Sequence, residues 1–207
     1  MSQRIEPLEY GKYYHIYNRA VGRDNLFRHH ANYEHFLRLY DKYIEPVAET
    51  FAWCLMPNHL HLLIRMKTLE EILEANKPDR FSKPVRFTKP KRPHQFFSNL
   101  FNAYTKAFNI RYNRHGSLFC RSFERIRITN EKYFCNLVWY IHNNPVHHGF
   151  VEHMIEYPWS SYQTMISVKP TKLSRDKVVG WFNSRNEFQV FHQDDQNVED
   201  IRRFIIE

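Results

Sequence analysis

The stretch WCLMPNHLHLLIRM, residues 53–66, decides how this chain is expected to fold. It contains two apolar runs separated by a Pro-Asn pair, which is typical of a turn. We therefore predict two neighbouring strands, one over 47–56 and one that begins at the histidines after the turn. Side chains alternate between the two faces of a strand, so His59, His61 and Arg65 should share one face and an apolar set the other.

Two imidazoles on one face of a partly buried strand need polar partners. A metal ion is one such partner, because two ring nitrogens leave positions for a third residue, water or a substrate oxygen. Hydrogen bonds from His59 and His61 to backbone or to a neighbouring strand are the simpler alternative. Short motifs of this kind also occur by chance, so the pair by itself leaves both interpretations open.

Composition indicates a globular, basic protein. Its 207 residues are 43% hydrophobic and 16% aromatic, which suits one domain with appendages and a substantial core. The formal net charge of +8 favours an anionic partner, with nucleic acid first among them. No apolar run reaches the length of a membrane span, the N-terminal residues lack a signal peptide, and the three cysteines are widely spaced. We therefore expect a cytoplasmic protein.

Hydrophobic periodicity predicts the order strand, helix, strand, strand, helix, strand. The expected ranges are 10–19, 30–43, 47–56, the histidine strand, 94–113 and 121–129. A further helix over 131–143, capped by Asn130, should end at Pro145, and short helices are expected over 68–75, 173–181 and 198–206. This is the pattern of an α+β, ferredoxin-like βαββαβ sheet with an additional helix on its C-terminal side. We expect one domain over 1–166 and a helical appendage over 167–207.

Basic side chains are concentrated in a proline-rich segment, 77–93, and on the predicted strand 121–129. Four prolines forbid a regular element in the first, which is either a solvated loop or an arm that grips a phosphate backbone. The arginines of the strand share one face, which suits phosphate contact or a solvated sheet edge. The candidate DNA-binding residues are Arg19, Arg65, Lys83, Arg86, Lys89, Lys91, Arg92, Arg121, Arg125 and Arg127.

Several short motifs together carry a family resemblance. They are YHIYNR (14–19), MPNHLHLL (56–63), GSLF (116–119), RSF (121–123), YIHNNPV (140–146) with Gly149, and YPWSSY (157–162). In this order they resemble the single-tyrosine HUH transposases, in which HUH means His-hydrophobic-His, and most of all the REP-associated tyrosine transposases. The set spans roughly the first four-fifths of the chain.

The resemblance implies a catalytic role for Tyr140, which becomes joined to a 5′ phosphate while a 3′ hydroxyl leaves. It implies that His59, His61 and Asn144 bind Mg²⁺ or Mn²⁺, although ligand type alone leaves Zn²⁺ open. The expected activity is metal-dependent cleavage and rejoining of single-stranded or hairpin DNA, by a transposase associated with the nucleoid. A homodimer is a further expectation from the broader family.

Two other functions compete with this interpretation. A DNA-hairpin-binding protein could retain the transposase fold without turning over its substrate. An RNA-binding ferredoxin-like module would leave the two-histidine face without a purpose, and residues 57–65 and 140–146 do not match RNA-recognition motifs. A covalent adduct with DNA would separate the enzyme from both.

Overall fold

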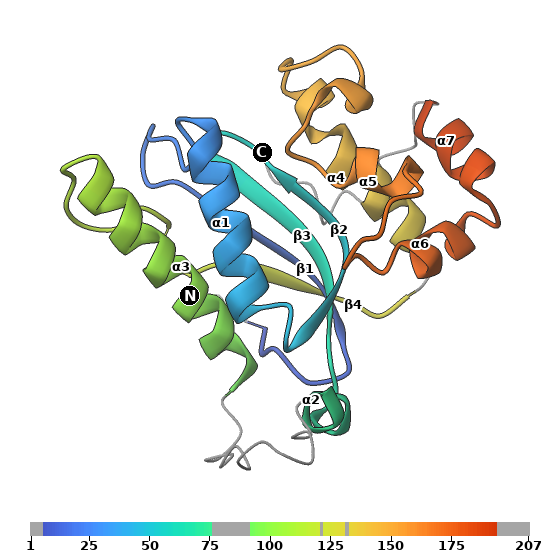
Figure 1. The fold of residues 1–207 in the computed structure, drawn as a ribbon, viewed down its shortest axis with the longest axis horizontal. Helices are drawn as coiled ribbons and strands as arrows, with labels where there is room; N and C mark the ends of the chain where they lie inside the picture. Colours follow the sequence, from blue (N-terminus) through green and yellow to red (C-terminus); the bar gives the residue numbers. More distant parts are fainter. Residues whose placement is uncertain (1–5, 76–91, 121, 131–132, 194–207) are drawn as a thin grey trace.

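A computed structural model describes residues 6–75, 92–120, 122–130 and 133–193. Its centre is a four-stranded antiparallel sheet in the order β2-β3-β1-β4 (Figure 1). The strands are β1 (Tyr13–Arg19), β2 (Ala48–Leu55), β3 (His59–Met66) and β4 (Glu124–Ile128). With one long helix between β1 and β2 and another between β3 and β4, this confirms the predicted ferredoxin-like βαββαβ arrangement.

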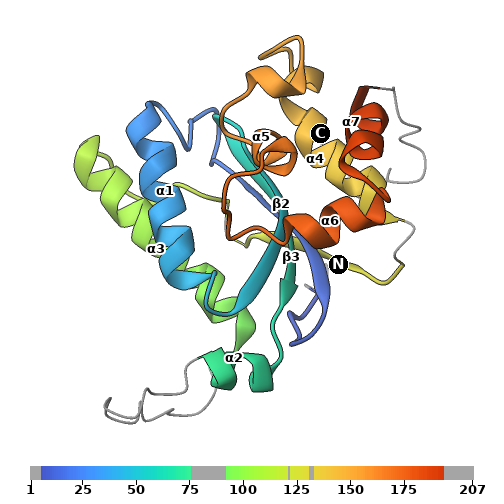
Figure 2. The same cartoon turned by 45° about the vertical axis from the view of Figure 1, so that its right-hand side comes forward.

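Helices cover both faces of the sheet. On one face α1 (His30–Tyr43) and α3 (Pro93–Arg111) pack side by side, while α2 (Leu69–Ala75) lies beyond the end of β3 (Figure 1). The other face carries α4 (Phe134–His147), followed by a single 3₁₀ turn (Met154–Glu156), α5 (Tyr162–Ile166), α6 (Arg175–Trp181) and α7 (Arg185–Gln193) (Figure 2). None of the helices in the described ranges is long and apolar enough to cross a membrane.

Strand β3 separates two hydrophobic cores. Leu60, Leu62 and Ile64 point into the core shared with α1 and α3, whereas Leu63 points into the core shared with α4. The alternation predicted for this strand is therefore confirmed, and the face that carries His59 and His61 is turned toward α4.

The pairing of β1 with β3 brings further polar residues to this face. Tyr17 lies opposite His61, and Arg19 lies opposite His59. Two residues earlier along β1, His15 occupies the same face and is fully buried. Because these pairs join residues at least 40 positions apart, only the sheet register places them together.

The edge strand β2 is covered by the chain that follows α4. The backbone N–H groups of Leu55 and Ser174 donate to carbonyls across this edge, those of Trp159 and Thr50, respectively. Covering an edge satisfies its unpaired backbone groups. Farther along, Val178, Phe182 and Phe188 are buried in the same core as α4. The described part of the predicted appendage is thus packed into this core, and it includes a helix, α7, that the sequence did not predict; the predicted helix 198–206 lies outside the described residues.

Helix α4 departs from its predicted boundary. It continues through Pro145 to His147, so the prediction that the proline ends the helix is wrong. Proline removes one backbone donor, but Pro145 lies in the last turn, where the N–H of His148 still donates to the carbonyl of Asn144 at 3.0 Å. Asn144 therefore keeps its helical position one turn after Tyr140.

Candidate metal and nucleophile site

The predicted site residues from β3 and α4 come together. His59 Nε2 lies 3.5 Å from Asn144 Oδ1, although the two residues are 85 positions apart. The ring of His61 lies 5.1 Å from that of His59 and 5.5 Å from that of Tyr140. Packing of α4 across the histidine face of β3 thus collects two imidazoles, one amide and one phenol.

The Asn144 amide is held with its oxygen toward the histidines. Its Nδ2 donates to the backbone carbonyl of Tyr140 at 2.7 Å, which leaves Oδ1 facing His59. His59 in turn places Nδ1 2.7 Å from the side-chain oxygen of Asn58, which can only accept. His59 Nδ1 therefore carries the ring proton, and Nε2 presents a lone pair. Two lone pairs that face each other form no hydrogen bond, whereas a cation between them would satisfy both.

His61 offers a third donor. Its Nδ1 lies 3.0 Å from His15 Nε2, and its Nε2 is buried with no hydrogen-bonding partner among the described residues. A buried polar atom without a partner costs about 1–3 kcal/mol. A divalent cation would remove that cost, so these residues fit the metal implied by the family resemblance. Within the described ranges no three His, Cys, Asp or Glu side chains could hold a metal, so such a site depends on the amide oxygen.

Burial keeps the site histidines neutral. It lowers the pKa of His59 to about 4, with a smaller contribution from His148, and it holds the pKa of His61 well below its usual value. Neutral imidazole is the form that binds metal. Two histidines and an amide add no charge of their own, so a bound divalent cation would keep its full charge toward a phosphate.

A pocket of about 380 Å³ borders the site on its open side. Tyr17, Arg19 and His148 line it together with His59 and His61. Arg19 is exposed at the end of β1, directly opposite His59. Burial, and then the Glu124 carboxylate and the Tyr140 hydroxyl, raise the pKa of Tyr17 to about 12. The pocket therefore offers a cation, an aromatic ring and polar groups next to the metal donors.

Sequence reasoning missed His15, Tyr17 and His148 as residues of this site. The first two share one strand face, but only the pairing of β1 with β3 brings that face to the histidines. His148 follows Asn144 by one helical turn, and its ring lies 5.1 Å from that of His59. The spacing of four residues would have placed His148 beside Asn144 on a continuous helix, but the helix was predicted to end at Pro145.

The predicted arginines of β4 lie away from this site. Arg125 pairs with Ile16 and Arg127 with Tyr14, residues whose side chains enter the core beneath α1 and α3. The alternation predicted for the strand is right, but the arginine face is opposite to the histidine face. Arg125 stacks on the Phe123 ring at 4.6 Å, and Arg127 forms an ion pair with Glu9 at 3.3 Å.

The other predicted DNA-binding residues are scattered. Arg65 lies at the far end of β3, where its guanidinium binds Glu49 and Glu71, each at 2.6 Å. These ion pairs give it a structural partner at a distance from the metal donors, and DNA contact by Arg65 stays a prediction. Arg92 is exposed at the start of α3. The remaining candidates lie outside the described residues: Lys83, Arg86, Lys89, Lys91 and Arg121.

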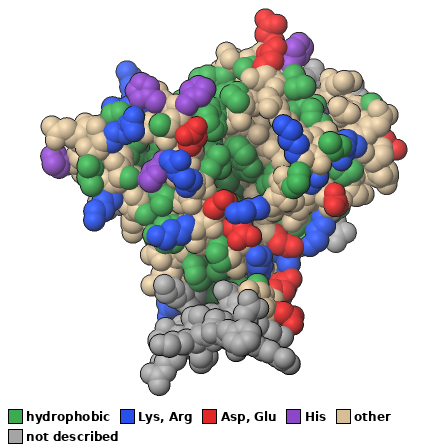
Figure 3. Space-filling model, viewed as in Figure 1, with side chains coloured by type: hydrophobic (Ala, Val, Ile, Leu, Met, Phe, Trp, Pro, Cys, Tyr) green, Lys and Arg blue, Asp and Glu red, His purple; other side chains and the backbone are tan. Residues whose placement is uncertain are grey.

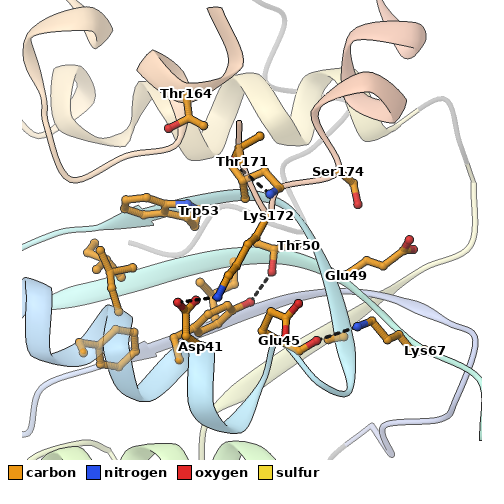
Figure 4. A pocket seen from close by; sticks show the side chains of 17 residues that line it. Asp41, Glu45, Glu49, Thr50, Trp53, Lys67, Thr164, Thr171, Lys172 and Ser174 are labelled. Carbon is orange, nitrogen blue, oxygen red and sulfur yellow. Dashed lines mark hydrogen bonds and ion pairs between the residues drawn. The ribbon is translucent and has the colours of Figure 1, made fainter. Parts of the chain in front are cut away.

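A separate pocket of about 520 Å³ lies between α1, β2 and the segment 171–174 (Figure 4). Lys172 reaches across it to Asp41 at 2.9 Å, and Glu45 and Glu49 also line it. None of the predicted catalytic or metal-binding residues contributes to this pocket. Its acidic side chains disfavour a phosphate backbone, so we do not assign it to DNA.

Comparison with known proteins agrees with the motif resemblance. No protein-family model matches the chain. It is 31% identical over 117 residues to a Haemophilus influenzae protein named "Putative REP-associated tyrosine transposase", an alignment that covers 55% of this chain and 58% of that protein. The chain thus spans little more than half the length of this curated relative.

A solved structure, that of a REP-associated tyrosine transposase bound to a REP hairpin, superposes with a TM-score of 0.59 at 19% identity. The match covers 82% of this chain and 89% of the other, and it establishes a shared fold. The chain is therefore similar to REP-associated tyrosine transposases, in sequence over about half its length and in fold over most of it.

Proposed function

We propose that this chain is a REP-associated type of tyrosine transposase, which cleaves and rejoins single-stranded or hairpin DNA through a 5′-phosphotyrosine at Tyr140. The observation that carries the proposal is the convergence of Tyr140 with three candidate metal-binding atoms, Nε2 of His59, Nε2 of His61 and Oδ1 of Asn144. The sequence similarity and the shared fold support it independently.

The chain supplies the nucleophile and its orientation. A phenol has a pKa of about 10 and is a poor nucleophile at neutral pH, so attack depends on placement and on the electrophile. Tyr140 is buried to 7% exposure, and its ring packs edgewise against His61, which restricts its direction. When bound, a divalent cation would neutralise charge on a phosphate oxygen and polarise the scissile bond.

The reaction conserves the energy of the phosphodiester. The bond from Tyr140 Oη to phosphorus forms as the bond to the 3′ oxygen breaks, and that oxygen leaves as a hydroxyl. Because the phosphotyrosine retains a reactive ester, a 3′ hydroxyl can later reverse the step and join strands. No nucleotide cofactor is needed.

A basic surface next to the site suits the DNA backbone. The loop 20–28 is fixed to the turn before β3, where the N–H of Ala20 donates to the Asn58 carbonyl at 2.8 Å. This loop carries the exposed Arg23 and Arg28. Asp24, also in the loop, forms ion pairs with both Arg28 and Arg114. In the space-filling view, histidine and basic side chains gather over the adjoining ends of α1 and α3 (Figure 3). We propose that this surface and Arg19 contact the phosphates of the DNA.

A covalent-adduct assay tests the proposal. Labelled single-stranded DNA with a candidate hairpin is incubated with the protein and Mn²⁺, and the products are separated on a denaturing gel. We expect a protease-sensitive, slowly migrating band that EDTA and Tyr140→Phe abolish. Tyr17→Phe is the control for the other phenol at the site, and it should retain the band. Hairpin binding on a native gel with no covalent band would instead favour a non-catalytic hairpin-binding protein.

A further inference from the structure

We propose that His15 is a positioning residue that sets the tautomer of His61, so that Nε2 of His61 presents a lone pair to the cation. The inference deepens the proposed function and rests on it for the identity of the ligand. It concerns a side chain that does not itself reach the metal position.

The contact between the two rings is buried and well aligned. His15 is fully buried in β1, and its Nε2 lies 3.0 Å from Nδ1 of His61. The rings are stacked, with centroids 5.2 Å apart and planes inclined by 19°. The same His15 ring also packs edgewise on Tyr140 at 6.2 Å, so it supports both the ligand and the proposed nucleophile.

One proton lies between the two nitrogens, and its owner decides what His61 can do. A neutral imidazole has one N–H and one lone pair. If His15 donates, Nε2 of His61 carries the second proton and points it where no acceptor is found among the described residues. If His61 donates from Nδ1, its Nε2 holds a lone pair that a cation can use. Only the second arrangement leaves Nε2 of His61 free of a proton, and it therefore prepares the ligand.

The choice of acceptor also affects charge. Metal-binding histidines usually donate their second N–H to a carboxylate, a backbone carbonyl or water. An imidazole acceptor fixes the tautomer in the same way but adds no negative charge. The cation would then keep its attraction for a DNA phosphate.

The test compares His15→Leu with His15→Gln in the DNA-free full-length protein. Leucine cannot accept a hydrogen bond, whereas the glutamine oxygen can accept one from Nδ1 of His61. We expect His15→Leu to weaken Mn²⁺ binding by about 10- to 100-fold, and His15→Gln to restore most of it. His142→Leu is the matched control, because it removes a buried histidine from a second His–His pair, at His192, and should leave the Mn²⁺ dissociation constant unchanged.

A second measurement needs no variant. Nitrogen NMR shifts of His61 in the wild-type protein should show the proton on Nδ1, both without metal and with Mg²⁺. A proton on Nε2 in the metal-free protein, or wild-type Mn²⁺ affinity in folded His15→Leu, would overturn the inference. Tyr140→Phe should bind Mn²⁺ normally, so loss of the covalent adduct with metal binding intact would count against strand transfer and not against His15.

Discussion

Two buried histidine pairs in this molecule have nearly the same geometry and different surroundings. His15 and His61 lie 3.0 Å apart on the sheet, and His142 and His192 lie 3.1 Å apart between α4 and α7. In the second pair every ring nitrogen has a partner; in the first, Nε2 of His61 has none among the described residues. The comparison indicates that a closed network holds the structure together, whereas an open one is prepared for a ligand.

In the closed network, the direction of each hydrogen bond follows from the backbone groups at its two ends. The Phe188 carbonyl can only accept, so Nδ1 of His192 donates to it at 2.8 Å. Nε2 of His192 then accepts from Nδ1 of His142, and Nε2 of His142 accepts from the Ser161 hydroxyl at 2.7 Å. Ser161 Oγ in turn accepts the N–H of Trp53 on the edge strand. This chain of bonds joins α7, α4 and β2 without an unused position.

The largest expected effect breaks the open pair. His61→Ala should abolish the metal-dependent adduct and weaken Mn²⁺ binding by at least about 100-fold, because a ligand is lost and not merely its support. Its free energy of unfolding should also fall in the absence of metal, because the variant loses a buried ring and the hydrogen bond between His61 and His15. Urea denaturation together with a Mn²⁺ titration measures both quantities. Unchanged Mn²⁺ affinity would contradict the assignment of His61 as a ligand.

Breaking the closed pair should lower stability and leave metal binding intact. Ser161→Ala leaves Nε2 of His142 and the Trp53 N–H without their partner, which should cost about 1–3 kcal/mol of unfolding free energy. The Mn²⁺ affinity should remain that of the wild type, because none of the hydrogen bonds in this network involves His59, His61 or Asn144. Urea denaturation of the variant checks the cost, and a stability equal to wild type would show that water replaces the hydroxyl.

The closed pair should also make stability depend on pH. Burial lowers the pKa of His192 to about 4 and that of His142 well below its usual value. In the unfolded chain both histidines titrate near pH 6.5. Between that pH and about 4 they are therefore protonated in the unfolded state but neutral in the native state. Stability is therefore complete above about 6.5 and falls as the pH drops toward 4. His192→Phe should flatten this part of the curve relative to wild type; equal slopes in both proteins would refute the role of the pair.

The smallest expected effect concerns the DNA surface. Arg19→Ala should weaken hairpin binding only a few-fold. It should also reduce the slope of log affinity against log salt concentration by the amount expected for about one phosphate contact. Arg127→Ala is the matched control, since Arg127 lies on the opposite sheet face beside Glu9. Fluorescence anisotropy at several salt concentrations measures both variants. A larger loss of affinity from Arg127→Ala than from Arg19→Ala would contradict the proposed DNA surface, because it would place the DNA on the opposite face of the sheet.

Local pattern was enough to predict much of the fold. Alternation along residues 59–66 correctly placed His59 and His61 on one face, and the helical spacing of Tyr140 and Asn144 placed that pair one turn apart. Such features depend on neighbours within a few positions. The same alternation also identified the arginine face of β4, because a strand has only two faces.

What the sequence did not predict depends on long-range pairing. The sheet face on which Arg125 and Arg127 lie is set by the register of β4 against β1. The meeting of His15 with His61 likewise needs β1 to lie beside β3 in one register. The continuation of α4 through Pro145 depends on hydrogen bonds made by the residues around it, which a rule about proline alone does not include.

The most direct test of the account is to identify the residue that carries the DNA. The protein is incubated with hairpin DNA and Mn²⁺, digested, and the nucleotide-bearing peptide is sequenced by mass spectrometry. The account predicts a 5′ phosphate on Tyr140, formed only when the divalent cation is present. An adduct on Tyr17 or on any other side chain, or none on a hairpin that the protein binds, would contradict it.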